Sequence, residues 1–106
     1  SIEDAMVAKI TKQYPFLAPA KIPANTYKGQ TEDVKTIAVM AVLIALPKLS
    51  EQVGYNITKA LIENQAELAS AHAKGKELSL QGAVKGVSIP FHPGALKYFK
   101  EKGALK

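Results

Sequence analysis

The sequence predicts a mixed α/β fold in which a sheet is flanked by helices. One observation is a run of eleven uncharged residues, 36–46, which is apolar after its first residue and is followed by Pro47. The other is that the segments before and after it, 1–13 and 50–73, repeat apolar residues at helical spacing. A strand that is apolar on every side is typical of a sheet covered by helices.

The apolar run is the centre of the predicted fold. Several of its residues are Val or Ile, whose branching at Cβ favours an extended backbone. The prediction is therefore a buried strand within residues 34–46, and a buried helix is the alternative that the same pattern fits. The run is long for one strand, so we expect it to bend or to pass from one packed layer into another.

Composition bounds the class of protein. The chain has 106 residues, enough for one domain with a modest core, and no cysteine, which excludes disulfides. Its net charge of +5 comes from 14 lysines, without arginine, against 9 acids. Lysines spread in this way, without interleaved aromatic residues, indicate a solvated surface rather than a nucleic-acid site. The apolar run is also shorter than the roughly 20 residues that a bilayer span needs.

The first element is an amphipathic helix over 1–13. Ser1 and Asp4 have the spacing of a capping box, so we expect them to begin it. Residues 14–26 then change character, because a proline recurs every four residues and stops any helix. We expect extended pieces at a sheet edge there, where a missing N–H is tolerated. The three prolines are Pro15, Pro19 and Pro23.

A polar loop, 25–33, lies directly before the apolar run. Loops held by a strand often carry binding residues, and the side chains of Thr26, Tyr27 and Gln30 have the donors, acceptors and ring to contact a small anion. The alternative is a plain turn in which Gly29 supplies a positive φ. For Tyr27 the alternative is a ring that caps the sheet.

The second half of the chain predicts three helices. Ser50 is a plausible N-cap for the long helix over 50–73, which we expect Gly75 to end, with His72 in its last turn and Asn64 on its apolar face or edge. The two further helices are a short one over 80–85, capped by Ser79 and ended by Gly86, and a last one over 93–102, with Pro93 at its first position and Gly103 past its end.

The residues give little support to an enzyme. There is no thiol, and the two histidines, His72 and His92, are not spaced as a metal-ligand pair on one helix or hairpin. No Gly-x-Ser-x-Gly turn or glycine-rich phosphate loop is present. The expectation is therefore a protein without catalytic activity, metal or cofactor. The start of the last helix at His92 is a generic anion site or, more simply, a packed turn.

Several short strings, taken in order, resemble one family. They are Tyr14-Pro15-Phe16, the segment 22–30 read as IPANTYxGQ, Asp33-Val34-x-Thr36, the segment 53–60 read as VxYxITKA and the segment 89–98 read as IPxHPGAxxY, where x is any residue. Together they are similar to the C-terminal third of TAXI-type solute receptors, the extracytoplasmic binding subunits of TRAP transporters. The resemblance covers about residues 14–102.

This resemblance implies a two-lobed periplasmic-binding-protein fold of type II, of which residues 1–106 are a single C-terminal fragment. It implies a periplasmic receptor that captures a small organic acid or amino acid, such as glutamate or another dicarboxylate, and delivers it to the membrane subunits. Residues 34–46 are then expected to cross between lobes. Within this picture Thr26, Tyr27 and Gln30 are the predicted ligand contacts.

Two further expectations follow from a receptor fragment. Half a cleft binds ligand weakly, and sheet edges meant for the remainder of the receptor chain favour self-association. The alternative function is a self-contained α/β interaction or structural domain that oligomerises.

Overall fold

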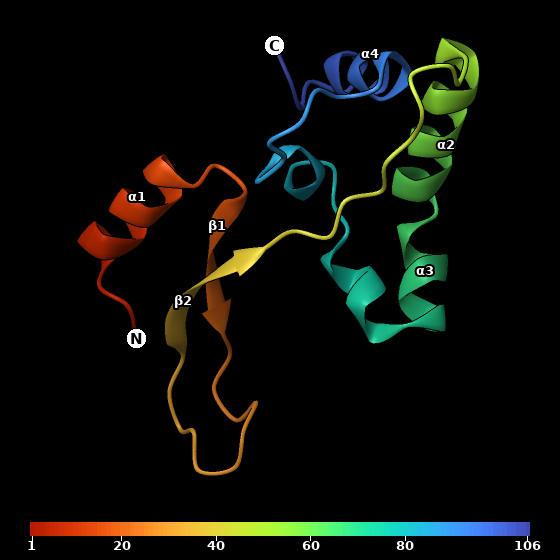
Figure 1. Cartoon of the computed structure of the whole chain (residues 1–106). Coiled ribbons are helices and arrows are strands. Elements are labelled where there is room, and N and C mark those ends of the chain that lie inside the picture. Colours follow the sequence, from red (N-terminus) through yellow and green to blue (C-terminus); the bar gives the residue numbers. More distant parts are fainter. The chain divides into compact units, whose positions relative to one another are not determined.

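The computed structural model describes all 106 residues, and it confirms the predicted mixed α/β class. The elements in chain order are α1 (Asp4–Gln13), β1 (Leu17–Ile22), β2 (Val34–Val39), α2 (Glu51–Glu63), α3 (Gln65–Ala71), the 3-10 helices η1 (Ala73–Glu77) and η2 (Gly82–Val84), and α4 (Pro93–Glu101). The chain divides into two compact units (Figure 1). The first unit is Ser1–Val42 with Gly86–Ser88, and the second is Leu43–Lys85 with Ile89–Lys106.

In the first unit, α1 begins later than predicted and is not closed by a capping box. Glu3 is the N-cap and makes no side-chain cap bond. The Ser1 hydroxyl instead accepts a hydrogen bond from the backbone N–H of Lys35, and the Asp4 carboxylate pairs with the Lys35 ammonium at 2.9 Å. The polar side chains at the start of the chain therefore tie it to β2 rather than to its own helix.

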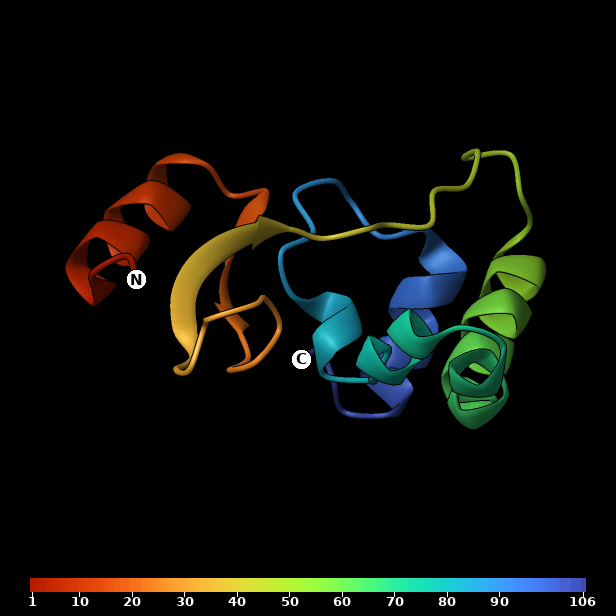
Figure 2. The same ribbon diagram turned by 90° about the horizontal axis from the view of Figure 1, so that it is seen from below.

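The strands β1 and β2 form an antiparallel hairpin beside α1 (Figure 2). Both backbone groups of Lys35 point away from β1: its N–H reaches Ser1 Oγ and its C=O accepts from the N–H of Ile2 at 2.9 Å. Backbone groups alternate in direction along an antiparallel strand, so those of Ile37 also point outward. Pro19 lies opposite Ile37, where its missing N–H costs no ladder bond. This alternation of inward and outward backbone groups explains how a proline fits within β1.

The strand predicted within 34–46 is much shorter than expected. β2 ends at Val39, opposite the first residue of β1, whose N–H is directed to Tyr14 O at 3.0 Å. Beyond that point the backbone has no strand to pair with. The run is also exposed rather than buried: the exposed fractions of Leu43, Ile44 and Leu46 are 73%, 73% and 75%. The boundary between the two units falls inside it, between Val42 and Leu43.

In the second unit, the single helix predicted over 50–73 is two helices separated at Asn64. The start is as predicted, because Ser50 Oγ accepts from the N–H of Val53 at 3.2 Å. At Asn64 the backbone leaves helical geometry (φ −109°, ψ 28°), and the side-chain amide donates to Ala60 O at 2.8 Å. A short amide that bonds to its own backbone competes with the helix, which accounts for the break.

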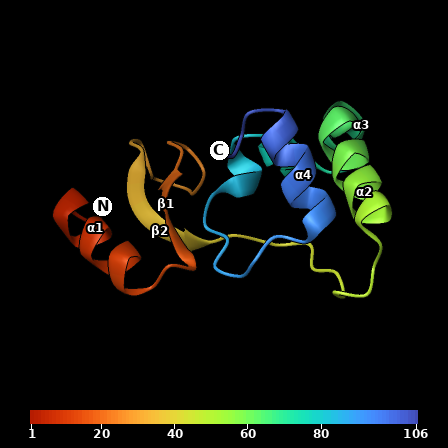
Figure 3. The ribbon, with the colours of Figure 1, turned by 90° about the horizontal axis from the view of Figure 1, so that it is seen from above.

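Helices α2 and α4 pack against each other and cross at two glycines (Figure 3). A Cβ on Gly94 would collide with the backbone of Glu51 and Tyr55, and a Cβ on Gly54 would collide with the ring of His92. His92 secures the crossing: its Nε2 lies 2.8 Å from Leu49 O, and its Nδ1 accepts from the N–H of Gly94 at 3.1 Å. With Nδ1 as an acceptor, the ring donates to Leu49 O through Nε2.

Aromatic rings build the core beside this crossing. Tyr98 and Phe99 are 1% and 4% exposed. Tyr55 and Phe91 meet them edge to face, with ring centroids 5.6 and 5.5 Å apart. The Tyr55 hydroxyl donates to the Glu101 carboxylate at 2.6 Å, which raises the pKa of Tyr55, whereas burial chiefly raises the pKa of Tyr98. Both phenols therefore stay neutral, and any stability from these two shifts is present below pH 10 and lost as pH rises above it.

The segment between α3 and α4 is tied by local caps. His72 follows α3 instead of lying in its last turn, and its Nδ1 accepts from the N–H of Lys74 at 3.1 Å, which begins η1. Ser79 caps as predicted, with Oγ accepting from the N–H of Gly82 at 3.0 Å, although the helix it begins is the 3-10 helix η2. Gly86 and Gly103 have positive φ, as expected of residues that follow helix ends.

We expect Gly94→Ala to destabilise the second unit by about 1–3 kcal/mol or more, since the added methyl meets backbone that cannot rotate away. Urea unfolding followed by circular dichroism measures the change. Lys100→Ala on the exposed side of α4 is the matched control, for which we expect a change within about 0.5 kcal/mol. Equal stability of the two variants would show that the glycine contact is not required.

Candidate functional site

The polar loop joins β1 to β2 and projects from the hairpin end. Two residues with positive φ turn the chain, Asn25 at 64° and Gly29 at 83°. Backbone bonds close the turn, from Asn25 N to Gln30 O at 2.8 Å and from Gln30 N to Tyr27 O at 3.1 Å. The structure therefore brings the three predicted ligand residues together in one tight loop, with the positive φ expected at Gly29.

The polar atoms of two predicted ligand residues are used within the loop. Thr26 Oγ1 donates to Pro23 O at 2.6 Å. The Gln30 amide nitrogen lies 3.0 Å from Pro23 O and 2.9 Å from Glu32 O, and its oxygen accepts from the N–H of Tyr27 at 3.3 Å. Both side chains thus hold the loop in shape, so a ligand would meet them only in competition with these bonds.

Tyr27 is the free group of the loop. Its side chain is 66% exposed and does not cap the sheet. The hydroxyl makes no hydrogen bond and the ring stacks on no other ring, so both remain available to a ligand. An exposed tyrosine on a loop braced by its neighbours presents a flat apolar face and a hydrogen-bonding tip at small entropic cost.

Sequence reasoning missed Asp33, which joins the two ends of the loop. Its carboxylate accepts from the Lys21 ammonium at 2.7 Å and from the N–H of Ala24 at 2.8 Å. The hydrogen bond from Lys21 is the main reason that the pKa of Asp33 lies below its usual value of 3.8. The sequence shows an acid directly before β2 and a lysine near the end of β1. That these two side chains meet follows only from the strand register.

The start of α4 is a packed turn rather than an open anion site. The N–H of Gly94 is directed to the His92 ring, and the N–H of Leu96 to His92 O at 2.9 Å. Gly94 itself is buried against α2. Of the two alternatives for this segment, the packed turn is the one observed.

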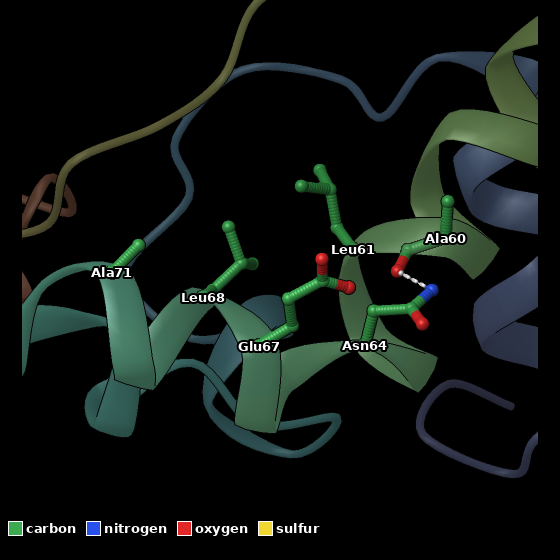
Figure 4. A pocket seen from close by; sticks show the side chains of 6 residues that line it. All are labelled: Ala60, Leu61, Asn64, Glu67, Leu68 and Ala71. Carbon is green, nitrogen blue, oxygen red and sulfur yellow. Dashed lines mark hydrogen bonds between the residues drawn. The ribbon is translucent and has the colours of Figure 1, made fainter.

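The second unit holds an open hollow of about 480 Å³ along α2 and α3 (Figure 4). Glu67 contributes a carboxylate and Asn64 an amide whose nitrogen is already bonded to Ala60 O. The other lining residues are Ala60, Leu61, Leu68 and Ala71. One acid on an apolar wall is a poor match for an anionic ligand. The predicted ligand loop belongs to the first unit and takes no part in this hollow.

The chain matches the model of the NMT1-like family over residues 1–103. It belongs to the NMT1-like family. This is a periplasmic-binding-like family, whose members are typically extracytoplasmic and bind small molecules. No helix in the NMT1-like chain is long and apolar enough to cross a membrane. The match supports the solute-binding part of the predicted resemblance.

For the NMT1-like chain, no group of three or more His, Cys, Asp or Glu side chains is arranged to hold a metal ion. The loop that carries Tyr27 is the candidate region for contact with a small molecule, through hydrogen bonds and ring contact.

We expect Lys21→Gln to raise the pKa of Asp33 toward 3.8. The carboxyl shift of Asp33, followed by NMR across the acid range, measures it. Because the folded-state pKa is lowered, stability from the Asp33 contacts is present above pH 3.8 and is lost as pH falls through the lower folded value. Lys12→Gln, in α1 and without an ion pair, is the control. An unchanged Asp33 titration in Lys21→Gln would contradict the assignment.

We expect Gln30→Ala to lower the stability of the first unit by about 1 kcal/mol, the usual net worth of such hydrogen bonds. The amide of Asn25, which donates to Gln30 O, should exchange faster with solvent because the braced turn loosens. Hydrogen exchange by NMR reads this directly. Gln13→Ala, at the exposed end of α1, should leave the exchange unchanged. Full protection of Asn25 in Gln30→Ala would argue against bracing by this side chain.

Proposed function

We propose that this chain is the C-terminal part of a TAXI-type solute receptor of a TRAP transporter. In this proposal the receptor captures a small organic acid or amino acid, such as glutamate or another dicarboxylate, outside the cytoplasm and delivers it to the membrane subunits. It catalyses no reaction and uses no cofactor. The single observation that carries the proposal is the family match over residues 1–103, to which the ordered strings of residues 14–102 add the finer assignment.

The loop supports a role in binding. Tyr27 projects from a turn that Thr26 and Gln30 brace, so the backbone at Tyr27 is held in place before ligand arrives. A preorganised backbone loses little freedom on binding, which favours affinity for a small solute. The net charge of +5 attracts anions in general, and the loop supplies the local contact.

The proposed receptor binds in a cleft between two lobes, and this chain supplies only one side of it. Ligand enclosed on one side keeps much of its surface in water, so the affinity of the chain by itself is low. A self-contained interaction domain is the second candidate function, and the exposed apolar run after β2 is the observation that favours it.

We expect glutamate and succinate, titrated into the ¹⁵N-labelled chain, to shift the amide resonances of Thr26, Tyr27 and Gln30 with a Kd in roughly the millimolar range. Tyr27→Ala should abolish the saturable shifts, and Tyr27→Phe separates the hydroxyl from the ring. Sodium chloride at matched ionic strength controls for non-specific attraction of anions.

Two outcomes would contradict parts of this proposal. Micromolar binding by the chain alone would overturn the one-sided cleft, and the absence of saturable shifts in the loop would remove Tyr27 from the site. The genomic sequence flanking the coding region tests the assignment separately. An export signal and a first lobe upstream support a receptor, whereas a free-standing reading frame of this length favours the self-contained domain.

A further inference from the structure

The two histidines of the chain act in the same way at the start of two helices. Nδ1 of His72 accepts a hydrogen bond from the N–H of Lys74 at 3.1 Å, and Nδ1 of His92 accepts one from the N–H of Gly94 at 3.1 Å. Helix caps usually use the side-chain oxygen of Ser, Thr, Asp or Asn, which accepts throughout the neutral pH range. An imidazole nitrogen accepts only while it carries no hydrogen, so both caps depend on the protonation of the ring.

The two caps differ in their surroundings. His72 is exposed, so water can replace its ring nitrogen as the acceptor. His92 is half-buried, and the N–H that it caps belongs to Gly94, which is buried against α2. Pro93 has no N–H, so the N–H of Gly94 is the first donor of α4. A buried N–H that loses its acceptor destabilises the folded chain, because water does not reach it easily.

The ring of His92 is held in place from two sides. Its Nε2 lies 2.8 Å from Leu49 O, so this nitrogen carries the hydrogen that bonds to the carbonyl. A Cβ on Gly54 would collide with Nδ1 and Cε1, so α2 lies directly against that edge of the ring. A proton taken up by His92 must therefore bind at Nδ1. It would place two N–H groups, those of the ring and of Gly94, opposite each other.

The charged side chains near His92 do not compensate for this loss. The titratable groups on the segments packed against it are those of Lys48, Glu51, Tyr55 and Lys97. The Glu51 carboxylate lies 3.8 Å from the Lys97 ammonium, so that cation offsets its attraction for an imidazolium. Both hydrogen bonds of the ring are with backbone atoms. Protonation of His92 therefore removes the cap and forms no ion pair in its place.

We propose that His92 is a pH-sensitive switch: uptake of a proton at Nδ1 removes the cap of α4 and loosens the crossing between α2 and α4. Imidazole in water takes up its proton around pH 6.5. In the folded chain this uptake breaks a hydrogen bond, so the folded state binds the proton less readily than the unfolded state. Stability from the cap is therefore present above about pH 6.5 and is lost as pH falls below it. This inference does not depend on the proposed transport function.

Urea unfolding at pH 7.5 and at pH 5.0, followed by circular dichroism, tests the proposal. Between these values histidine is the only side chain that ordinarily changes its charge. We expect the unfolding equilibrium constant to rise roughly tenfold at pH 5.0, an effect of the size of one helix cap. His92→Asn keeps an acceptor at the cap that does not titrate, so its two constants should agree within about twofold. His72→Asn is the matched control at the exposed cap and should retain the tenfold change.

An NMR titration of the folded, unmodified chain gives a second reading that needs no variant. As the His92 ring protons titrate, the amide proton of Gly94 should move upfield in step with them, because its hydrogen bond is lost. The proposal is overturned if the unmodified chain is equally stable at both pH values, or if His92→Asn retains the full change. It is also overturned if His72→Asn abolishes the change, or if the Gly94 amide does not follow the ring of His92.

Discussion

The antiparallel ladder between β1 and β2 is the constraint on which the first unit depends. Its register sets the length of the loop at one end and places Asp33 against Lys21 there. Along each strand, the backbone groups of alternate residues point away from the partner strand. Pro19 occupies such a position, so its missing N–H removes no hydrogen bond between the strands. The same alternation leaves Ile37 with outward groups that nothing in the chain satisfies. The candidate loop and the unpaired backbone groups of Ile37 therefore both follow from the register of this ladder.

The second unit depends on a different feature, two glycines at the contact between α2 and α4. Because Gly54 and Gly94 have no side chain, the backbones of α2 and α4 come into direct contact at Gly94, and the ring of His92 packs against Gly54. Close approach of this kind is unforgiving, since an added methyl has nowhere to go. It also closes the start of α4, which removes that helix end from the list of ligand sites. At the start of α4, the backbone N–H groups that could bind an anion are covered by the packing against α2.

Local signals in the sequence predicted the features that depend on local chemistry. Ser50, Ser79 and Gly103 act where capping rules place them, and the prolines of residues 14–26 gave the edge strand. The end of β2 could not be predicted in this way, because it depends on where β1 starts. Nor could the break at Asn64, where a side-chain bond to Ala60 O outweighed a continuous apolar stripe. Asp33 needed the strand register before its role was visible.

The loop shows why residue type alone is a weak guide to a binding site. Thr26, Tyr27 and Gln30 are all capable of contacting a solute, and they are close together, yet the bracing of the turn occupies the first and third. A short polar loop must satisfy its own carbonyls and N–H groups before it can serve a ligand. The side chain left over, Tyr27, is the one that the turn does not need. Its freedom is therefore a consequence of the hydrogen bonds within the loop, which use the side chains of its neighbours and leave the Tyr27 ring without a partner.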